Sequence, residues 1–255
     1  MVKRILCIVL WVVTAAALVV LFIFARENYL NTPLKSIQLI SEADTGFVRK
    51  SELCEELKQI CNRSNNIGTI NMIAIQNHLN NNPWIEDNAS YIDMDGTLNV
   101  SFKEYEPKFR VFDRDGHSAY VTQEGMVVPA CNNYTPYVLI ASGNFHLDND
   151  TSTYQLNDTL DRDRNLLNAL HWIKAVEENP FIKNCVGQLY CNRRNEFELT
   201  VRGLEARVIA GDTCLAADKL KRLEIFMKQR IDHPETKILK SINLNYKNQI
   251  VCTKR

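Results

Sequence analysis

The feature that most constrains this chain is a run of twenty residues without a charged side chain, residues 5–24, close to the N-terminus. As a helix that rises about 1.5 Å per residue, the run would cover roughly 30 Å, the thickness of the hydrocarbon core of a bilayer. Residues 15–17 are all alanine and would suit a signal-peptide cleavage site, but the apolar run continues past them to Phe24. The sequence therefore predicts a retained transmembrane helix over residues 5–24.

The charges that flank this run predict its orientation. Lys3 and Arg4 precede it together with the terminal amine, whereas Arg26 and Glu27 after it cancel. Because the cytoplasmic flanks of transmembrane helices carry an excess of Lys and Arg, we expect the N-terminus in the cytoplasm. Residues 1–4 would then form a cytoplasmic tail, and everything after the helix would be exported.

The composition is that of an ordinary globular protein. Of the 255 residues, 45% are hydrophobic and 24% are charged, and 30 basic residues balance 30 acidic ones. Because there is no basic field to hold phosphates, nucleic acid is not an expected partner. The length allows one large or two modest folded domains.

The cysteines form no recognisable metal or redox motif. Cys7 lies in the predicted membrane helix, no CxxC pair occurs, and an odd number of cysteines remains outside the helix. Cys54 and Cys61 are seven positions apart on one predicted helix, which separates them by about 10 Å of rise, too far for a disulfide. We favour the interpretation that the exported cysteines are small buried apolar residues, over a disulfide framework. They are Cys54, Cys61, Cys131, Cys185, Cys191, Cys214 and Cys252.

The first exported segment has the pattern of a small mixed domain. A polar linker over residues 25–33 leads to an alternating strand over residues 34–40. Ser51 is the expected N-cap of a helix with an apolar stripe. A second helix begins near Asn71 and must end before Pro83, which disfavours helical geometry in the residue that precedes it.

The second half of this segment predicts a β-hairpin. Strands over residues 89–93 and 97–105 are joined at Asp95 and Gly96, where glycine accepts the positive φ of a tight turn. One face of the second strand carries Leu98, Val100, Phe102 and Glu104. The order is therefore strand, helix, helix, strand, strand, and the predicted domain covers residues 34–106.

Beyond Pro107 the chain changes to short strands separated by turn signals. We predict an α+β fold whose second domain, residues 107–255, is mainly antiparallel β with two flanking helices. The helices are expected over residues 160–179 and 215–230. Strands are expected over residues 109–112, 118–122, 126–128, 137–141, 182–191, 196–201 and 207–210, and the chain closes on residues 238–252 as one bent strand or two.

The order and spacing of these features resemble the FtsQ/DivIB family of bacterial cell-division proteins over essentially the whole chain. The apolar helix that leads to residues 83–85 (PWI) and the strand that runs to Glu106 and Pro107 resemble the family's first exported domain, a POTRA module of βααββ order. Residues 208–211 (VIAG) and the ending INLNY at residues 242–246 resemble its β domain. Further matching positions are Asp115, Gly116, residues 125–129, Phe197, Leu199, Gly203, Leu220, Leu223 and Phe226.

The resemblance implies a non-enzymatic scaffold of the divisome that links early and late division proteins. Such a protein would be a single-pass protein of the inner membrane at the division septum, with its main domains in the periplasm and with no cofactor. In FtsQ-like proteins the edge near the C-terminus holds FtsB, which pairs with FtsL, and the POTRA module docks other divisome members. The partners implied for this chain are therefore FtsB-like and FtsL-like proteins.

A strand near the end of a chain is often a sheet edge, whose unpaired main-chain groups accept an incoming strand. We therefore predict the partner site on the terminal strand. Trp84 has two interpretations, an interface anchor or ordinary core packing, of which we favour packing. The predicted partner-binding residues are Tyr246, Lys247, Asn248, Gln249, Ile250 and Val251.

No enzyme signature occurs in the sequence: there is no G-x-S-x-G, no H-E-x-x-H and no phosphate-binding glycine loop. The five histidines are scattered without the spacing of metal ligands. Asp93 with Asp95, and Asp161 with Asp163, lie at a hairpin turn and a helix start, where turn formation and capping explain them. We therefore predict no catalytic residue, no metal and no cofactor.

Two other functions stay open. A POTRA-containing escort of envelope polypeptides would also use strand addition, although its usual repeats or membrane β-barrel are not seen in the sequence. A membrane-anchored envelope hydrolase would need a Cys and a His that meet only in the folded protein.

Overall fold

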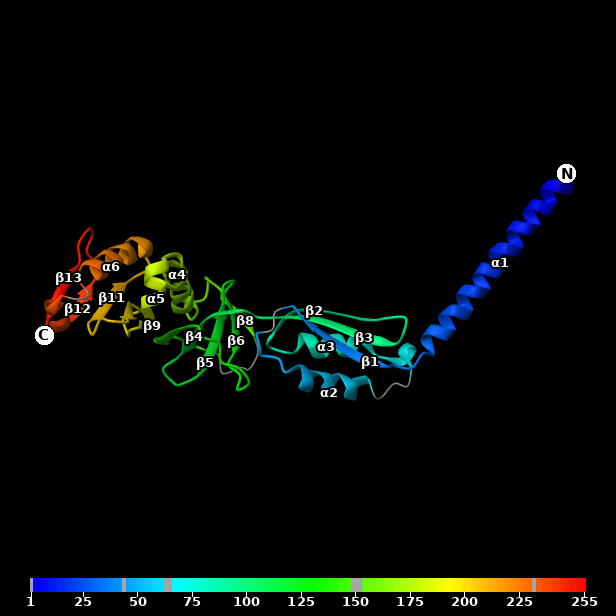
Figure 1. The fold of residues 1–255 in the computed structure, drawn as a ribbon, viewed down its shortest axis with the longest axis horizontal. Coiled ribbons are helices and arrows are strands. Elements are labelled where there is room, and N and C mark those ends of the chain that lie inside the picture. The colour runs from blue at the N-terminus through cyan, green and yellow to red at the C-terminus, as the bar shows by residue number, and fades with distance from the viewer. Residues whose placement is uncertain (1, 43–44, 62–65, 148–152, 231–232) are drawn as a thin grey trace. The chain divides into compact units, whose positions relative to one another are not determined.

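The computed structural model describes residues 2–42, 45–61, 66–147, 153–230 and 233–255. Its class is α+β with an N-terminal apolar helix, which confirms the predicted class (Figure 1). The chain forms two compact units, Met1–Glu104 and Tyr105–Arg255. Each unit has a hydrophobic core of its own and is described by itself.

The first unit opens with the apolar helix α1, Val2–Leu30. Its segment Val9–Leu30 has 22 residues and contains an 18-residue window with a mean hydropathy of 2.4 and no buried part, so it is long and apolar enough to cross a membrane. The helix continues through residues 25–30, which were predicted as linker, because no helix breaker precedes Pro33.

A three-stranded sheet follows, in the strand order β1-β3-β2. Strand β1 is parallel to β3, and β2 is antiparallel to β3. Helices α2 and α3 lie on one face of this sheet (Figure 1). The predicted order of strand, helix, helix, strand, strand is confirmed: β1 Ser36–Ser41, α2 Lys50–Cys61, the 3₁₀ helix η1 Ile67–Thr69, α3 Met72–Asn80, β2 Ile85–Ile92 and β3 Thr97–Glu104.

The helices of this unit follow from their apolar spacing. Leu53, Leu57 and Cys61 recur every fourth residue of α2 and are buried, so one stripe of the helix faces the sheet. Helix α2 begins at Lys50, so Ser51 lies inside it and the prediction that Ser51 is the N-cap is wrong by two residues. Asn71 does cap α3, because its Oδ1 accepts a hydrogen bond from Ala74 N at 3.0 Å.

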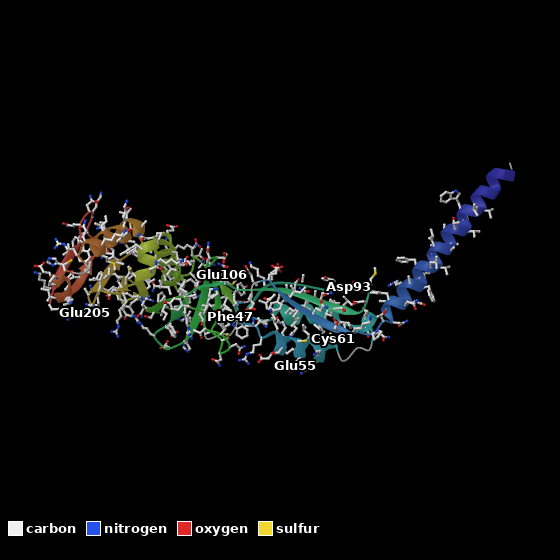
Figure 2. The ribbon with its side chains drawn as sticks, viewed as in Figure 1. Phe47, Glu55, Cys61, Asp93, Glu106 and Glu205 are labelled. Atoms are coloured by element: carbon white, nitrogen blue, oxygen red, sulfur yellow. The ribbon has the colours of Figure 1, made fainter. Side chains whose placement is uncertain are left out.

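The hairpin between β2 and β3 depends on Gly96. Its φ is +92°, and a Cβ there would lie 2.6 Å from the carbonyl oxygen of Pro33, so another residue would be strained and would also clash. Asp95 Oδ1 accepts a hydrogen bond from Thr97 N at 3.0 Å, and Asp93 Oδ1 accepts one from Met94 N at 2.7 Å. Both carboxylates therefore form the turn, as predicted; Asp93 is labelled in Figure 2.

The second unit is built on a ten-stranded sheet of order β13-β12-β11-β10-β9-β7-β4-β5-β6-β8. Most neighbouring strands are antiparallel, whereas β4 with β7, β7 with β9 and β11 with β12 are parallel. The helices are α4 Arg164–Glu178, α5 Pro180–Cys185, α6 Ala216–Arg230 and the 3₁₀ helix η2 Pro234–Ile238. The strands are β4 Pro107–Phe112, β5 Ser118–Thr122, β6 Met126–Pro129, β7 Leu139–Gly143, β8 Tyr154–Gln155, β9 Val186–Cys191, β10 Phe197–Val201, β11 Arg207–Gly211, β12 Leu239–Asn243 and β13 Val251–Lys254.

The segment after α4 differs from its prediction. Residues 182–191 were predicted as one strand, but α5 occupies the first part and β9 starts only at Val186. Asn179 is the reason, because its Oδ1 accepts hydrogen bonds from Phe181 N at 3.1 Å and Ile182 N at 3.0 Å. Pro180 then suits the first helical position, where an N–H would have no partner.

The end of the chain forms two strands, β12 and β13, which is one of the two arrangements predicted for residues 238–252. Tyr246, Lys247, Asn248, Gln249 and Ile250 lie in the connection between them, so the prediction that they form a strand is wrong; Val251 alone among the predicted partner residues is in β13. Asn248 within this turn adopts a φ of +58°, a conformation that asparagine tolerates better than most residues.

Glu104, the last residue of β3, is fully buried and holds a neighbouring segment in place. Its Oε2 accepts hydrogen bonds from Thr45 Oγ1 at 2.5 Å, Phe47 N at 2.8 Å and Val48 N at 3.3 Å. The carboxylate thereby satisfies backbone groups that no strand or helix pairs. Through these hydrogen bonds, Glu104 holds the residues that lead into α2 against the end of β3.

We predict that Glu104→Ala lowers the free energy of unfolding by about 2–3 kcal/mol, because it leaves two buried N–H groups without an acceptor. Glu104→Gln keeps one acceptor oxygen and should cost less. Urea unfolding of the full chain, together with hydrogen exchange of the Phe47 and Val48 amides, measures the effect. The control is Glu106→Ala, an exposed glutamate two residues further on; equal losses in the Glu104 and Glu106 variants would contradict this role.

Candidate functional site

Strand β13 lies at one end of the ten-stranded sheet. It pairs antiparallel with β12, with Val251 opposite Asn243 and Thr253 opposite Ser241. All of its residues are exposed, and among the described residues no strand pairs with its outer side. Its outward N–H and C=O groups are thus the kind of template that accepts an added strand.

The other end of the sheet offers a much shorter edge. Strand β8 comprises only Tyr154 and Gln155, and the Gln155 side chain already donates a hydrogen bond to the carbonyl oxygen of Glu124 at 2.8 Å. Short edge strands are a common way to prevent pairing with other chains. Within the described part of the second unit, β13 is therefore the edge better suited to a partner.

The connection between β12 and β13, residues 244–250, flanks this edge. Leu244 is fully buried and Ile250 packs against the core, whereas the residues between them are exposed. Tyr246 is 48% exposed and Val251 is 38% exposed, so an aromatic and an aliphatic side chain stand beside the strand. The structure thus brings the predicted partner residues together as one surface, although mostly as a loop.

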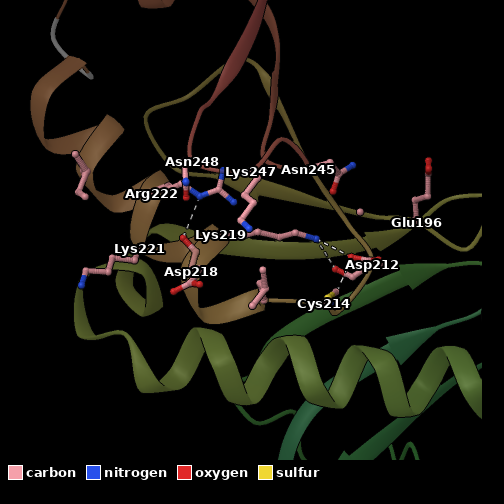
Figure 3. Close-up of a pocket in the computed structure, with 13 residues that line it drawn as sticks. Glu196, Asp212, Cys214, Asp218, Lys219, Lys221, Arg222, Asn245, Lys247 and Asn248 are labelled. Atoms are coloured by element: carbon pink, nitrogen blue, oxygen red, sulfur yellow. Dashed lines mark hydrogen bonds and ion pairs between the residues drawn. The ribbon is translucent and has the colours of Figure 1, made fainter.

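A hollow of about 610 Å³ lies between this connection, the end of β11 and the start of α6 (Figure 3). Leu215 and Ile225 line it as exposed apolar side chains. Its other walls carry charges of both signs: Asp212, Asp218, Lys219, Lys221 and Arg222. Such a mixture is typical of the rim of a protein interface. The sequence analysis did not detect this hollow, because its walls are far apart in the chain.

Lys219 and Asp212 form an ion pair at the start of α6. Lys219 is 5% exposed, and its Nζ donates to Asp212 Oδ1 at 2.8 Å and to the Asp212 carbonyl oxygen at 2.9 Å (Figure 3). The ammonium also lies 5.7 Å from the centre of the Trp172 ring. The hydrogen bond from Lys219 lowers the pKa of Asp212 below its usual value of 3.8. The ion pair therefore holds the segment between β11 and α6 in place.

A second charged cluster lies at the β4–β5 turn, where ligand atoms of Asp113, Asp115 and His117 lie within 4.8 Å of one another. The sequence analysis missed this spacing when it described the histidines as scattered. Asp113 Oδ1 accepts from Asp115 N at 2.9 Å and from His117 N at 2.8 Å, and Oδ2 lies 2.9 Å from His117 Nδ1. Burial alone would raise the pKa of Asp113, but these contacts with His117 outweigh it and lower the pKa. We therefore assign the cluster to turn formation.

The remaining acidic and aromatic candidates have structural roles. Asp163 precedes α4 but does not cap it; its Oδ2 accepts a hydrogen bond from Asn157 N at 2.9 Å, so the predicted capping role is wrong. Asp161 lies 2.7 Å from Arg164 in an exposed ion pair. Trp84 is partly buried and packs against the core of the first unit, in line with the packing interpretation. A docking role for Trp84 stays a prediction.

The cysteines differ in exposure. Cys61 and Cys191 are buried, and burial raises the pKa of both thiols, that of Cys191 to about 11. The interpretation as buried apolar residues is confirmed for these two. It is wrong for Cys214 and for Cys252 in β13, which are exposed. All the described cysteines are free thiols in the structure.

The Lys219–Asp212 pair predicts a pH dependence. The folded-state pKa of Asp212 is lowered, so the pair's stabilisation is present above the ordinary value of 3.8 and is lost as the pH falls through the lower folded value. Lys219→Met should return the pKa of Asp212 towards 3.8 and remove this loss. NMR titration of Asp212 measures the shift, with Lys221→Met, an exposed neighbour on α6, as the control. An unchanged pKa in Lys219→Met would contradict the assignment.

Comparison with known proteins identifies the second unit. A model described as FtsQ/DivIB, C-terminal related, matches residues 106–253, which is more than half of the 255 residues. The search of curated proteins finds no match. The matched span contains β4 to β12, the hollow beside α6 and β13 as far as Thr253.

The matched family consists of non-catalytic division proteins. Together with α1, the match suggests a single-pass membrane protein at the division site, whose partners are other division proteins. The chain belongs to the FtsQ/DivIB family.

Proposed function

We propose that this chain is a non-enzymatic scaffold of the divisome that links early and late division proteins at the septum. The observation that carries the proposal is the exposed edge strand β13, whose outer side pairs with no described strand, in the domain that matches the family. A scaffold needs surfaces for contact rather than a reaction centre, and an open strand edge is such a surface.

The proposed partner is an FtsB-like protein in complex with an FtsL-like protein. An extended segment of the FtsB-like protein would add to β13 as an outer strand, held by main-chain hydrogen bonds. Side-chain contacts would come from the flanking connection, where Tyr246 and Val251 present apolar surface beside Lys247, Asn248 and Gln249. Main-chain pairing would supply affinity, and these side chains would supply specificity.

The first unit is proposed to be a POTRA domain over residues 34–106, followed by the β domain over residues 107–255. The order β1, α2, α3, β2, β3 supports this assignment. Other membrane proteins of the divisome would dock on the POTRA domain. We assign no particular face of it to them.

The proposed topology has residues 1–4 in the cytoplasm, α1 across the inner membrane and both units in the periplasm. The positive charges at Lys3 and Arg4 support this orientation. Confinement at the membrane would raise the effective concentration of the domains for partners that are confined there too. The mechanism is therefore geometric, and it needs no cofactor.

Photo-crosslinking in the native host tests the function. A photoreactive residue replaces Gln249 or Thr253 in the full chain, and the captured protein is identified by mass spectrometry. Thr200, an exposed residue of the central strand β10, provides the control position. We expect capture of a small single-pass coiled-coil division protein from the two edge positions and not from Thr200.

Other outcomes separate the alternatives. Capture of outer-membrane proteins or nascent polypeptides would favour an escort of envelope polypeptides. A hydrolase would be favoured if a single Cys or His substitution abolished function without loss of capture or of folding. No capture from a correctly folded protein would contradict partner binding at β13.

Proline substitution tests strand addition itself. Successive N–H groups of a strand point to opposite edges. Of the two variants Cys252→Pro and Thr253→Pro, one therefore removes an N–H donor that faces outward, and the other removes an N–H donor that faces β12. The outward variant should keep the β12–β13 hairpin, measured by hydrogen exchange, and should reduce capture at Gln249 at least about tenfold. Retention of full capture in both variants would show that the partner does not pair with this strand.

A further inference from the structure

We infer that Arg222 is a positioning residue that fixes the β12–β13 connection and thereby presents the β13 edge to the partner. The expected effect on partner binding rests on the proposed function, whereas the role of Arg222 in positioning the connection rests on contacts within the second unit. Arg222 lies on α6, partly buried, and faces the connection across the hollow (Figure 3).

The guanidinium of Arg222 donates hydrogen bonds to three carbonyl groups of the connection. Its Nη1 donates to the carbonyl oxygens of Tyr246 at 2.5 Å and Gln249 at 2.8 Å, and its Nη2 donates to that of Leu244 at 3.0 Å. Tyr246 and Gln249 bracket the turn that contains Asn248, which has a φ of +58°. Arg222 therefore joins both ends of the turn to α6.

These carbonyls lie between two strands and are outside the β-sheet ladder. The carbonyls of Tyr246 and Gln249 belong to exposed residues, so the Arg222 guanidinium replaces water as their donor and thereby restrains local opening of the loop. A planar guanidinium suits this task because its N–H groups diverge in a fixed fork and always carry charge. A lysine ammonium at this position would carry the same charge but would lack the planar, forked arrangement of donors.

The connection is supported on another side by the end of β11. Leu244 N donates to the carbonyl oxygen of Ile209 at 2.9 Å, and Asn245 N donates to Asn243 Oδ1 at 2.9 Å. A Cβ at Gly211, whose φ is +74°, would collide with the Asn245 side chain. These contacts fix the start of the connection, so Arg222 is the described residue whose side chain ties the start to the end, next to β13.

The fraction of molecules with an ordered connection determines how well β13 binds a partner strand. If the connection opens, Val251 and the rest of β13 lose their fixed register against β12, and only the ordered fraction can receive a partner strand. Apparent affinity falls in proportion to that fraction. Arg222 thus contributes to partner binding without touching the partner.

Hydrogen exchange of the full chain in detergent or nanodiscs tests the structural half. In Arg222→Gln, amide exchange over residues 245–253 should accelerate at least about tenfold, since hydrogen bonds to a charged donor are lost. Exchange in β10 should not change. Arg222→Lys should lie between Arg222→Gln and the wild type. Arg230→Gln removes the same charge from an exposed residue at the end of α6, outside the hollow, and should match the wild type.

Capture at Thr253, measured in the same variants, tests the functional half. We expect Arg222→Gln to reduce capture at least about fivefold and Arg230→Gln to leave it unchanged. Unchanged exchange in Arg222→Gln would overturn the inference, and so would accelerated exchange with undiminished capture. Absence of capture in the wild type would instead refute the proposed partner site, and the exchange result would still decide whether Arg222 holds the connection.

Discussion

A ten-stranded sheet that does not close into a barrel has two ends, and the main-chain groups at those ends determine what the second unit can do. At one end β8 is only two residues long and is partly engaged by its own side chain. At the other end β13 is longer, exposed and paired on one side. The exposed backbone of β13 is therefore the feature from which a contact function follows.

The rest of the second unit supports that edge. Helices α4, α5 and α6 cover the core that lies against the sheet, with Leu166, Trp172 and Leu223 fully buried. Helix α6 has a second task, because its partly exposed side carries Arg222, which binds the connection that leads into β13. One helix thus contributes both to the packing of the core and to the presentation of the edge.

Features set by neighbouring residues could be predicted from the sequence. The β2–β3 hairpin is an example, since Gly96 and the Asp95 side chain define the turn locally. The alternation of Leu98, Val100, Phe102 and Glu104 also assigned them to one face of their strand, and all four are buried. The family resemblance rested on the order of such local features, and the match over residues 106–253 confirms it.

Features set by distant contacts could not be predicted. Residues 246–250 combine aromatic and aliphatic side chains as a strand does, but Arg222, 24 positions before Tyr246, holds them as a turn. Helix α5 is a different case, because its start is set locally: Asn179 caps it, and Pro180 can begin a helix as well as end one. The spacing of Asp113, Asp115 and His117 was visible in the sequence, yet their contacts show turn formation.

The proposed role of the second unit depends on a partner strand that pairs with the outer side of β13. Hydrogen exchange of the full chain, measured with and without the purified complex of FtsB-like and FtsL-like proteins, detects such pairing. We expect strong protection of the outward-facing amides within residues 251–254 when the complex binds, because they gain main-chain acceptors. Binding that leaves these amides unchanged and protects another surface would contradict this proposed role.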